Sequence, residues 1–433
     1  MPVTRTAFGK NEAVSLPTQP RGLGPLSRRV LLRSTRAYLP GLALVLALAG
    51  GALASPATDL FERGYSLLQQ HYDGPSAADR PALHERYAAE LNALCADQAA
   101  CPLDTGRKEL GTLLAQLHDP HTSVRDPQAA ARLREALDDG QVVRTGVRLK
   151  DVSTNVQDGV LVTFVAPGSP AERAGLRRFD HIVSVNGQPL TATDFAGAER
   201  QGTELNLNVS TSEGTTRTVK VTPTRLRVND LPTLSLTGEN AVIVIPTFLA
   251  SGTASTFVRL LGQARSEGAR RLVVDLRYNG GGSLNECLAA ASAFGPVSYH
   301  STGKEGDFTA RASGGHLVRR AAPPADPLWS GPVAVLLGGD TASCSEVFTW
   351  ALGARAVTVG EPTKGALNSA VDFYDLPGGN LLSVSVSHAE DADGHLLPTR
   401  IVPQVAATET PTPRQDAALA TALKTLSTAG TAP

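Results

Sequence analysis

Residues 333–346 read VAVLLGGDTASCSE and combine a strand, a turn and the start of a helix. The continuous apolar run 333–337 predicts a buried strand, and residues 346–354 have the apolar spacing of a helix. Ser343 therefore lies on a strand-to-helix turn, where the first N–H groups of the helix have no partner inside it. These N–H groups and the positive end of the helix dipole would stabilise an oxyanion formed beside Ser343. The turn suits a serine nucleophile; the alternative is that Ser343 only caps the helix.

A second strand-to-helix turn lies upstream, in LVVDLRYNGGGS at residues 272–283. Its apolar strand runs into three glycines, and residues 284–294 follow with helical spacing. Glycines allow the backbone to approach a ligand closely and to aim N–H groups at it. Residues 241–245 and 253–266 predict a further strand and helix before this turn. Alternating buried strands and helices predict an α/β layer architecture around a mainly parallel sheet.

Three motifs in this order resemble the carboxyl-terminal processing and tricorn-type serine peptidases. They are DLRYNGGG at residues 275–282, TASCSE at 341–346 and GEPT at 360–363. The resemblance extends over residues 110–405. It implies a catalytic core at residues 229–433 with a ClpP/crotonase-like layered fold.

The resemblance also implies roles for individual residues. Ser343 matches the nucleophile of the family. The glycine loop at Gly281 and Gly282, together with the N–H of Cys344, matches the oxyanion hole. The implied reaction is hydrolysis of peptide bonds in polypeptide substrates through an acyl-enzyme, with neither a metal nor an organic cofactor.

The general base differs between branches of the family. Carboxyl-terminal processing enzymes use a lysine, but the matching position holds Ala366, and Lys364 lies earlier in the chain. A lysine base also needs a desolvating pocket to lower its pKa. The tricorn-like branch uses a histidine in an Asp-x-His-Thr setting, which DPHT at residues 119–122 resembles. His121 is therefore the predicted base, with activity rising at about pH 6 to 7, and Lys364 is the alternative.

A histidine base usually needs a third group that fixes its tautomer. In the tricorn-like branch this group is an acid late in the chain. Glu390, Asp391 and Asp393 are the candidates, but none falls on the family position. Asp119 is read as a residue that shapes the turn, and the third member stays unassigned.

Residues 125–228 contain short strands and turns and closely resemble a PDZ domain. The segments that carry this resemblance are TGVRL, VLVTFV, APGSPAERAGL and DHIVSVNG. Phe179 stands where a glycine is usual. The resemblance implies that an exposed strand edge binds the C-terminus of a peptide. The residues of this edge are Gly146, Val147, Arg148 and Leu149. The alternative is a domain that only supports or blocks the peptidase.

Residues 1–54 resemble a bacterial export signal. Arginines precede the apolar run 39–48, which is too short for a comfortable membrane span, and ALA at residues 52–54 suits cleavage after Ala54. The stretch SRRVLLR also resembles a twin-arginine signal, with leucine in place of the usual phenylalanine. The expected location is the periplasm, the cell envelope or the extracellular space. The alternative is a retained N-terminal anchor.

Residues 55–124 alternate helical patterns with polar breaks and predict a helical N-terminal region. Residues 311–324 have little apolar periodicity and predict a loop. The formal net charge of −1 suggests no nucleic-acid partner.

The four cysteines fall into two pairs with different expectations. In an exported chain Cys95 and Cys101 are close enough in sequence to form a disulfide. Cys287 and Cys344 both come close to the predicted site, and we expect them to be buried free thiols. Neither spacing resembles a metal site.

Two other functions compete with the peptidase. The absent lysine and the unassigned acid favour an exported binding or scaffold protein that keeps the fold without the chemistry. An esterase using Ser343 is the third reading, although a PDZ-like segment suits polypeptide ends better than small esters.

Overall fold

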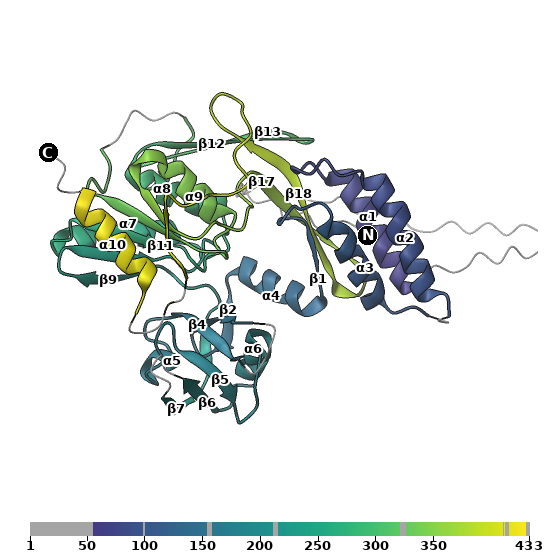
Figure 1. Cartoon of the computed structure of the whole chain (residues 1–433), viewed down its shortest axis with the longest axis horizontal. Coiled ribbons are helices and arrows are strands. Elements are labelled where there is room, and N and C mark those ends of the chain that lie inside the picture. The colour runs from purple at the N-terminus through teal and green to yellow at the C-terminus, as the bar shows by residue number, and fades with distance from the viewer. Residues whose placement is uncertain are drawn as a thin grey trace, which may run out of the picture.

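The computed structural model describes residues 55–97, 100–153, 158–210, 215–320, 326–409, 411 and 415–429 (Figure 1). The predicted export signal lies outside these residues. No helix in the described ranges combines the length and the apolar character that a membrane crossing requires.

A six-stranded sheet forms the centre of the C-terminal half. Its strands, in order across the sheet, are β19 (Val405–Ala406), β16 (Val357–Gly360), β15 (Val333–Leu337), β11 (Arg271–Asp275), β10 (Asn240–Val244) and β9 (Thr233–Thr237). All neighbours are parallel except β9 and β10. The predicted mainly parallel sheet is confirmed. Its ClpP/crotonase-like layering stays a prediction.

Helices cover both faces of this sheet (Figure 1). Side chains alternate along a strand, so Leu272 and Val274 of β11 pack with the helices of one face, while Val273 packs against the other. The first face carries α7 (Thr253–Ser266), α8 (Leu284–Ala291), the short 3₁₀ helix η2 (Ser292–Phe294) and α9 (Cys344–Leu352). The second face is covered by α10 (Ala417–Ala429).

A second, antiparallel sheet joins this core to the N-terminal region. Its strands are β1 (Ser123–Arg125), β18 (Leu381–Glu390), β12 (Val297–Gly303), β13 (Gly306–Ser313) and β14 (His316–Leu317), with β17 (Ser369–Asp375) also pairing with β18. The loop prediction for residues 311–324 is therefore wrong in part, because β13 and β14 extend into it. Most side chains of this hairpin are exposed, so its sequence has no apolar alternation.

Helices near the N-terminus pack on β17 and β18 through Tyr374, Leu382 and Val384. These helices are α1 (Pro56–His71), α2 (Arg80–Cys95) and α3 (Leu103–Ala115), and α4 (Pro127–Asp138) follows β1. Ser55, at the start of α1, accepts a hydrogen bond from the Thr58 N–H, and a proline follows it as the first helical residue. The Cys95–Cys101 disulfide closes the connection between α2 and α3.

The PDZ-like segment has an apolar core of its own. Its five antiparallel strands are β3 (Val147–Asp151), β4 (Val160–Val165), β5 (His181–Val185), β6 (Leu205–Ser210) and β7 (Thr216–Val221). Two helices accompany them, α5 (Pro170–Arg173) and α6 (Ala192–Arg200). A two-stranded ribbon links the segment to the rest of the chain, made of β2 (Gln141–Arg144) and β8 (Thr224–Arg227). Phe179 has a φ of 73°, a conformation that explains why a glycine is usual there.

A buried ion cluster connects three parts of the molecule. Arg277 and Asp275 have 1% exposed side chains and form an ion pair of 2.6 Å. Arg277 also binds Asp416, which lies just before α10, at 2.7 Å. Arg178 of the PDZ-like segment binds Asp275 at 2.8 Å. Burial alone would raise the pKa of Asp275, but the two guanidinium groups hold it well below its usual range.

Removal of the Arg277 guanidinium should strongly destabilise the fold. Arg277→Ala removes one partner of the buried Asp275 carboxylate and of the half-buried Asp416 carboxylate, and we expect the free energy of unfolding to fall by about 3 to 5 kcal/mol. Urea denaturation followed by circular dichroism measures the change. Arg270→Ala is the control, because Arg270 pairs with Glu239 at the surface. Equal effects of the two substitutions would contradict the structural role of the cluster.

Candidate active site

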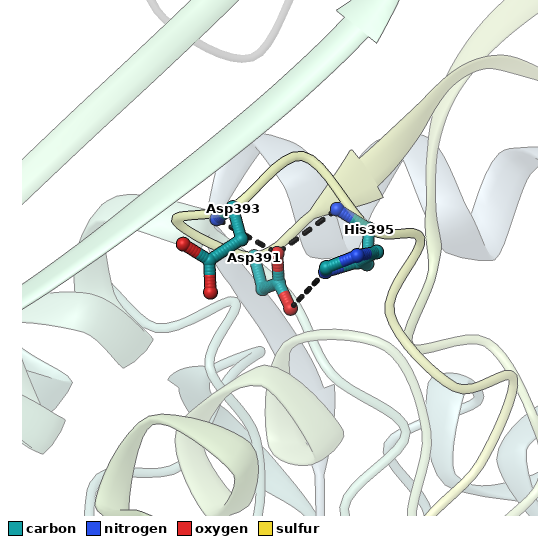
Figure 2. Close-up of side chains that lie close together, drawn as sticks. All are labelled: Asp391, Asp393 and His395. Atoms are coloured by element: carbon teal, nitrogen blue, oxygen red, sulfur yellow. Dashed lines mark hydrogen bonds and ion pairs between the residues drawn. The ribbon is translucent and has the colours of Figure 1, made fainter.

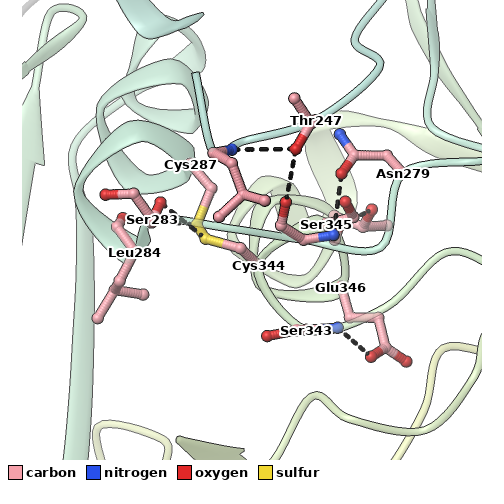
Figure 3. Close-up of a disulfide and its surroundings, with 12 residues drawn as sticks. Thr247, Asn279, Ser283, Leu284, Cys287, Ser343, Cys344, Ser345 and Glu346 are labelled. Carbon is pink, nitrogen blue, oxygen red and sulfur yellow. Dashed lines mark hydrogen bonds between the residues drawn. A yellow bond between two sulfur atoms is a disulfide. The ribbon is translucent and has the colours of Figure 1, made fainter. Parts of the chain in front are cut away.

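Ser343 lies between the end of β15 and the start of α9, as predicted. Its backbone has a φ of 53° and a ψ of −120°, which is unusual for a residue other than glycine. Two hydrogen bonds hold this conformation: the Ser343 N–H donates to Glu346 Oε2 at 2.7 Å, and the Glu346 N–H donates to the Ser343 carbonyl at 2.8 Å (Figure 3). Ser343 is therefore kept at a sharp turn whose side chain borders a cavity.

The Glu346 carboxylate connects this turn to the segment that follows β16. It is fully buried and also accepts hydrogen bonds from the Gly365 N–H at 3.0 Å, the Ala366 N–H at 2.8 Å and the Thr363 hydroxyl. Burial raises its pKa, and the hydrogen bonds oppose part of that rise. Ala366, which the resemblance matches to the family's lysine, contributes its backbone N–H to this network.

The glycine loop lies directly against Ser343. A Cβ added to Gly281 would come within 2.9 Å of Ser343 Cβ and 3.0 Å of Cys344 N, which explains the need for glycine. The Gly281 N–H, however, donates to Asn279 Oδ1 at 2.9 Å. Within the described part of the chain, the N–H groups of Gly282 and Cys344 have no such acceptor. Of the three predicted oxyanion donors, Gly282 and Cys344 are therefore free to bind a ligand, and Gly281 is not.

His121 faces the same cavity as Ser343 and the glycine loop, a space of about 290 Å³. The turn that carries it is shaped by Asp119, as the sequence suggested. Asp119 Oδ1 accepts from the His121 N–H at 3.1 Å, and its Oδ2 accepts from Thr122 Oγ1 at 2.8 Å. His121 and Ser343 share the cavity without a direct hydrogen bond between them, and such contacts often tighten only when substrate is bound.

The group that contacts the imidazole is a hydroxyl rather than an acid. His121 Nδ1 lies 2.8 Å from Ser369 Oγ, at the start of β17. Ser369 is separated from His121 by 248 residues and belongs to no motif, so the sequence carried no signal for it.

The surroundings of His121 favour the neutral form of its imidazole. Burial lowers the pKa of His121 from 6.5 to about 4, the positive charges of Lys364 and Arg125 add to this, and Asp119 opposes it. This direction differs from the expectation of an ordinary histidine titrating at about pH 6 to 7, and desolvation of the side chain is its main cause. Lys364 itself is exposed, which does not fit the buried lysine that the alternative requires.

The three acidic candidates for the third member lie elsewhere. Glu390 contacts His388 at 3.3 Å. Asp391 closes the turn after β18, where its Oδ1 accepts from the N–H groups of Asp393 and His395, each at 2.9 Å (Figure 2). The ligand atoms of Asp391, Asp393 and His395 lie within 4.8 Å of one another, a spacing that a cation could bridge. Because Asp391 already serves the turn, we assign no metal role to it.

All four cysteines form disulfides. Cys95 bonds to Cys101, as the sequence allowed. Cys287 bonds to Cys344, so the expectation of two free thiols is wrong (Figure 3). The two residues lie 57 positions apart, on helices α8 and α9 that pack side by side, and sequence spacing alone does not reveal this contact.

The predicted peptide-binding edge is at the border of the PDZ-like sheet. Gly146 has a φ of 97° and precedes β3, which pairs within its sheet with β4 alone. A cavity of about 300 Å³ lies beside this strand and is lined by Val147, Arg148 and Ala196. Arg148 also lines the cavity of Ser343 and His121, so the two cavities share a wall.

The chain is similar to known proteins in two of its segments and over much of its length. Residues 239–407 match the profile described as Peptidase family S41, and residues 137–210 match that of the PDZ domain. The chain is 29% identical over 322 residues to a carboxyl-terminal-processing protease of Picosynechococcus sp., covering 70% of this chain and 74% of the relative. It is 27% identical over 296 residues to the tail-specific protease of Haemophilus influenzae, covering 61% of this chain but only 40% of the relative.

A solved structure gives the same fold. The structure of a putative S41 protease from Bacteroides fragilis superimposes with a TM-score of 0.50 and 19% sequence identity, covering 84% of this chain and 97% of that one. The mixed α/β content, the N-terminal helices and the PDZ domain agree with the architecture expected from the sequence. Residues 239–407 therefore resemble peptidase family S41 and residues 137–210 a PDZ domain, and the chain as a whole is similar to carboxyl-terminal-processing serine proteases.

Proposed function

We propose that this chain is an exported serine endopeptidase that cleaves polypeptides through an acyl-enzyme on Ser343. The observation that carries the proposal is one cavity lined by Ser343, His121 and the glycine loop, residues that come from three distant parts of the sequence. The match of residues 239–407 to peptidase family S41 supports the serine chemistry. The strained turn at Ser343 supports the choice of nucleophile, because such conformations persist where the surroundings enforce them.

In the proposed reaction, Ser343 Oγ attacks the carbonyl carbon of the scissile bond while His121 takes the hydroxyl proton. Because Nδ1 is engaged by Ser369, Nε2 is the nitrogen that exchanges this proton. The N–H groups of Cys344 and Gly282 receive the negative charge that develops on the carbonyl oxygen. His121 then protonates the leaving amine. A water molecule, activated by the same imidazole, hydrolyses the acyl-enzyme.

The PDZ domain supplies a binding site for substrate C-termini in this proposal. The edge of β3 that faces away from β4 has no strand partner among the described residues, so it can accept an added strand. Gly146, Val147, Arg148 and Leu149 form this edge. Since Arg148 borders both cavities, a peptide bound there would lie next to the catalytic cavity.

Export is supported by the state of the cysteines. Both disulfides would be reduced in most cytosols, whereas they persist in oxidising compartments. Together with the signal-like residues 1–54, this favours the periplasm, the cell envelope or the extracellular space of a bacterium.

Substitution of the nucleophile tests the proposal directly. Ser343→Ala should lower the rate of casein cleavage by about 10⁴-fold or more, and His121→Ala nearly as much, because the two act as a unit. Lys364→Ala should change the rate only mildly. The mature proteins are assayed together with circular dichroism, to establish folding. Unchanged casein cleavage by Ser343→Ala would contradict the proposal. A wild-type protein that is folded but inactive would favour the alternative function, an exported binding or scaffold protein.

When kcat/KM is plotted against pH, its fall on the acid side reports the pKa of His121. A base must be neutral, so kcat/KM should fall as the pH drops through about 4 rather than through 6.5. Lys364→Ala removes a positive charge and should move this limb to higher pH, whereas Lys424→Ala on α10 should not. A wild-type midpoint above pH 6 would contradict the lowered pKa of His121.

The free energy of unfolding changes over the same pH range as the activity, so it must be measured alongside the activity. The depressed pKa means that the folded state binds fewer protons than the unfolded state between about pH 4 and 6.5. Stability is therefore retained above 6.5 and declines as the pH falls toward 4.

The hydroxyl of Ser369 should matter through its effect on His121. Ser369→Ala should lower kcat by roughly 10- to 100-fold with KM nearly unchanged, because the base loses the group that orients it. Ser369→Thr, which keeps a hydroxyl, should recover part of the activity. Ser298→Ala, at an exposed position of β12, is the control. A Ser369→Ala variant with wild-type kcat would show that the imidazole needs no partner at Nδ1.

A further inference from the structure

The Cys287–Cys344 disulfide joins the two elements that carry the free oxyanion donors. Cys344 follows Ser343 directly, and its N–H is one of these donors. Cys287 lies on α8, which begins shortly after Gly282, the other donor. Both cysteines are buried, with 0% and 3% exposure, and their Cα atoms lie 5.9 Å apart (Figure 3).

We propose that this disulfide positions the oxyanion hole, so that turnover requires the oxidised pair and falls when the pair is reduced. The inference rests on the proposed function, because it concerns the same site. It adds a redox requirement and two positioning residues, neither of which contributes a side chain to the reaction.

The two loops are connected on both sides of Ser343. Before it, the Ala342 N–H donates to the Asn279 carbonyl at 3.1 Å. After it, the disulfide connects Cys344 to α8, and Cys344 Sγ lies 3.0 Å from the Ser283 carbonyl oxygen. The nucleophile and the Cys344 N–H are therefore fixed between a hydrogen bond and a covalent bond.

Breaking the covalent bond must move one of these elements. Non-bonded sulfur atoms lie roughly 1.5 Å farther apart than bonded ones, and both thiols would be enclosed by protein. Donors of an oxyanion hole act within a narrow range of about 2.7–3.1 Å, and a misplacement of about 1 Å can cost 10²-fold in rate. A shift of Cys344 relative to Gly282 is thus expected to lower kcat more than it weakens substrate binding.

A small reductant would approach this bond through a cavity next to Ser343. Cys344 lines a cavity of about 210 Å³ next to Ser343, together with Leu284 and Val347. In the reduction, a dithiol gives two electrons and two protons to the pair, which becomes two thiols, while the dithiol closes to a cyclic disulfide. The reverse exchange with an oxidised dithiol restores the bond and the activity.

The chain contains its own matched control. We expect the double variant Cys287→Ser, Cys344→Ser to lose about 10- to 100-fold in kcat, with KM within about twofold of the wild type. The substitution at position 344 keeps the backbone N–H group. A loss of kcat therefore reports a shift of this N–H group and not its removal. Cys95→Ser, Cys101→Ser removes the other disulfide and should keep the wild-type kcat. The acylation rate of Ser343 by a fluorophosphonate should follow kcat, and thermal unfolding shows that each variant is folded.

A wild-type kcat in the Cys287/Cys344 variant would overturn the inference. If that variant does not fold, the wild type is reduced slowly with dithiothreitol, and samples are alkylated and analysed by mass spectrometry. Loss of activity should then follow the thiols of Cys287 and Cys344 while circular dichroism stays constant. Activity that persists after both are reduced would overturn the inference equally.

The nucleophile variant separates this result from the proposed function. If Ser343→Ala cleaves casein like the wild type, the proposed function fails. If Ser343→Ala is inactive while the Cys287/Cys344 variant is fully active, the function stands and the inference fails.

Discussion

The ion pair between Asp275 and Arg277 connects the parts of this molecule. Two fully charged side chains are buried at the end of the central strand β11, immediately before the glycine loop. Such a pair is tolerated only when its remaining hydrogen-bonding capacity is used, and here Arg178 and Asp416 use it. The PDZ domain, the sheet and the C-terminal helix therefore share one buried contact. The position of the loop that faces Ser343 depends on all three.

In the candidate site, most of the buried polar contacts hold backbone segments in place, and few side chains face the cavity for the reaction itself. Asn279, with 0% exposure, holds the glycine loop through Gly281, and Glu346 holds the backbone of Ser343 and of the segment up to Ala366. The ends of the proposed oxyanion hole are thus held by two buried polar side chains, those of Asn279 and Glu346. This suits stabilisation of a charge that appears only during reaction, since donors that are already in place need no rearrangement.

The sequence predicted those structural features that depend on residues adjacent to one another in the chain. Strand β15, helix α7 and the turn at Ser343 are each encoded by a continuous run of residues, and their positions were predicted to within a few residues. The contact of His121 with Ser369, the Cys287–Cys344 disulfide and the engaged Gly281 N–H were not predicted. They depend on segments far apart in sequence, or on an amide side chain whose orientation only the folded loop defines. Resemblance to a family did not reveal them either, because it concerns motifs and not their surroundings.

Helix α10 has a consequence for the order in which the enzyme is assembled. Asp416, which precedes this helix, follows Arg277 by 139 residues, and α10 covers a sheet face that includes Val273 and Ala334. A growing chain presents the glycine loop and the nucleophile well before α10 has been synthesised. Until then, the guanidinium of Arg277 lacks one of its carboxylates and an apolar face of the sheet stays in water. The contact between Arg277 and Asp416, and the cover of this sheet face, can therefore form only after α10 has been synthesised.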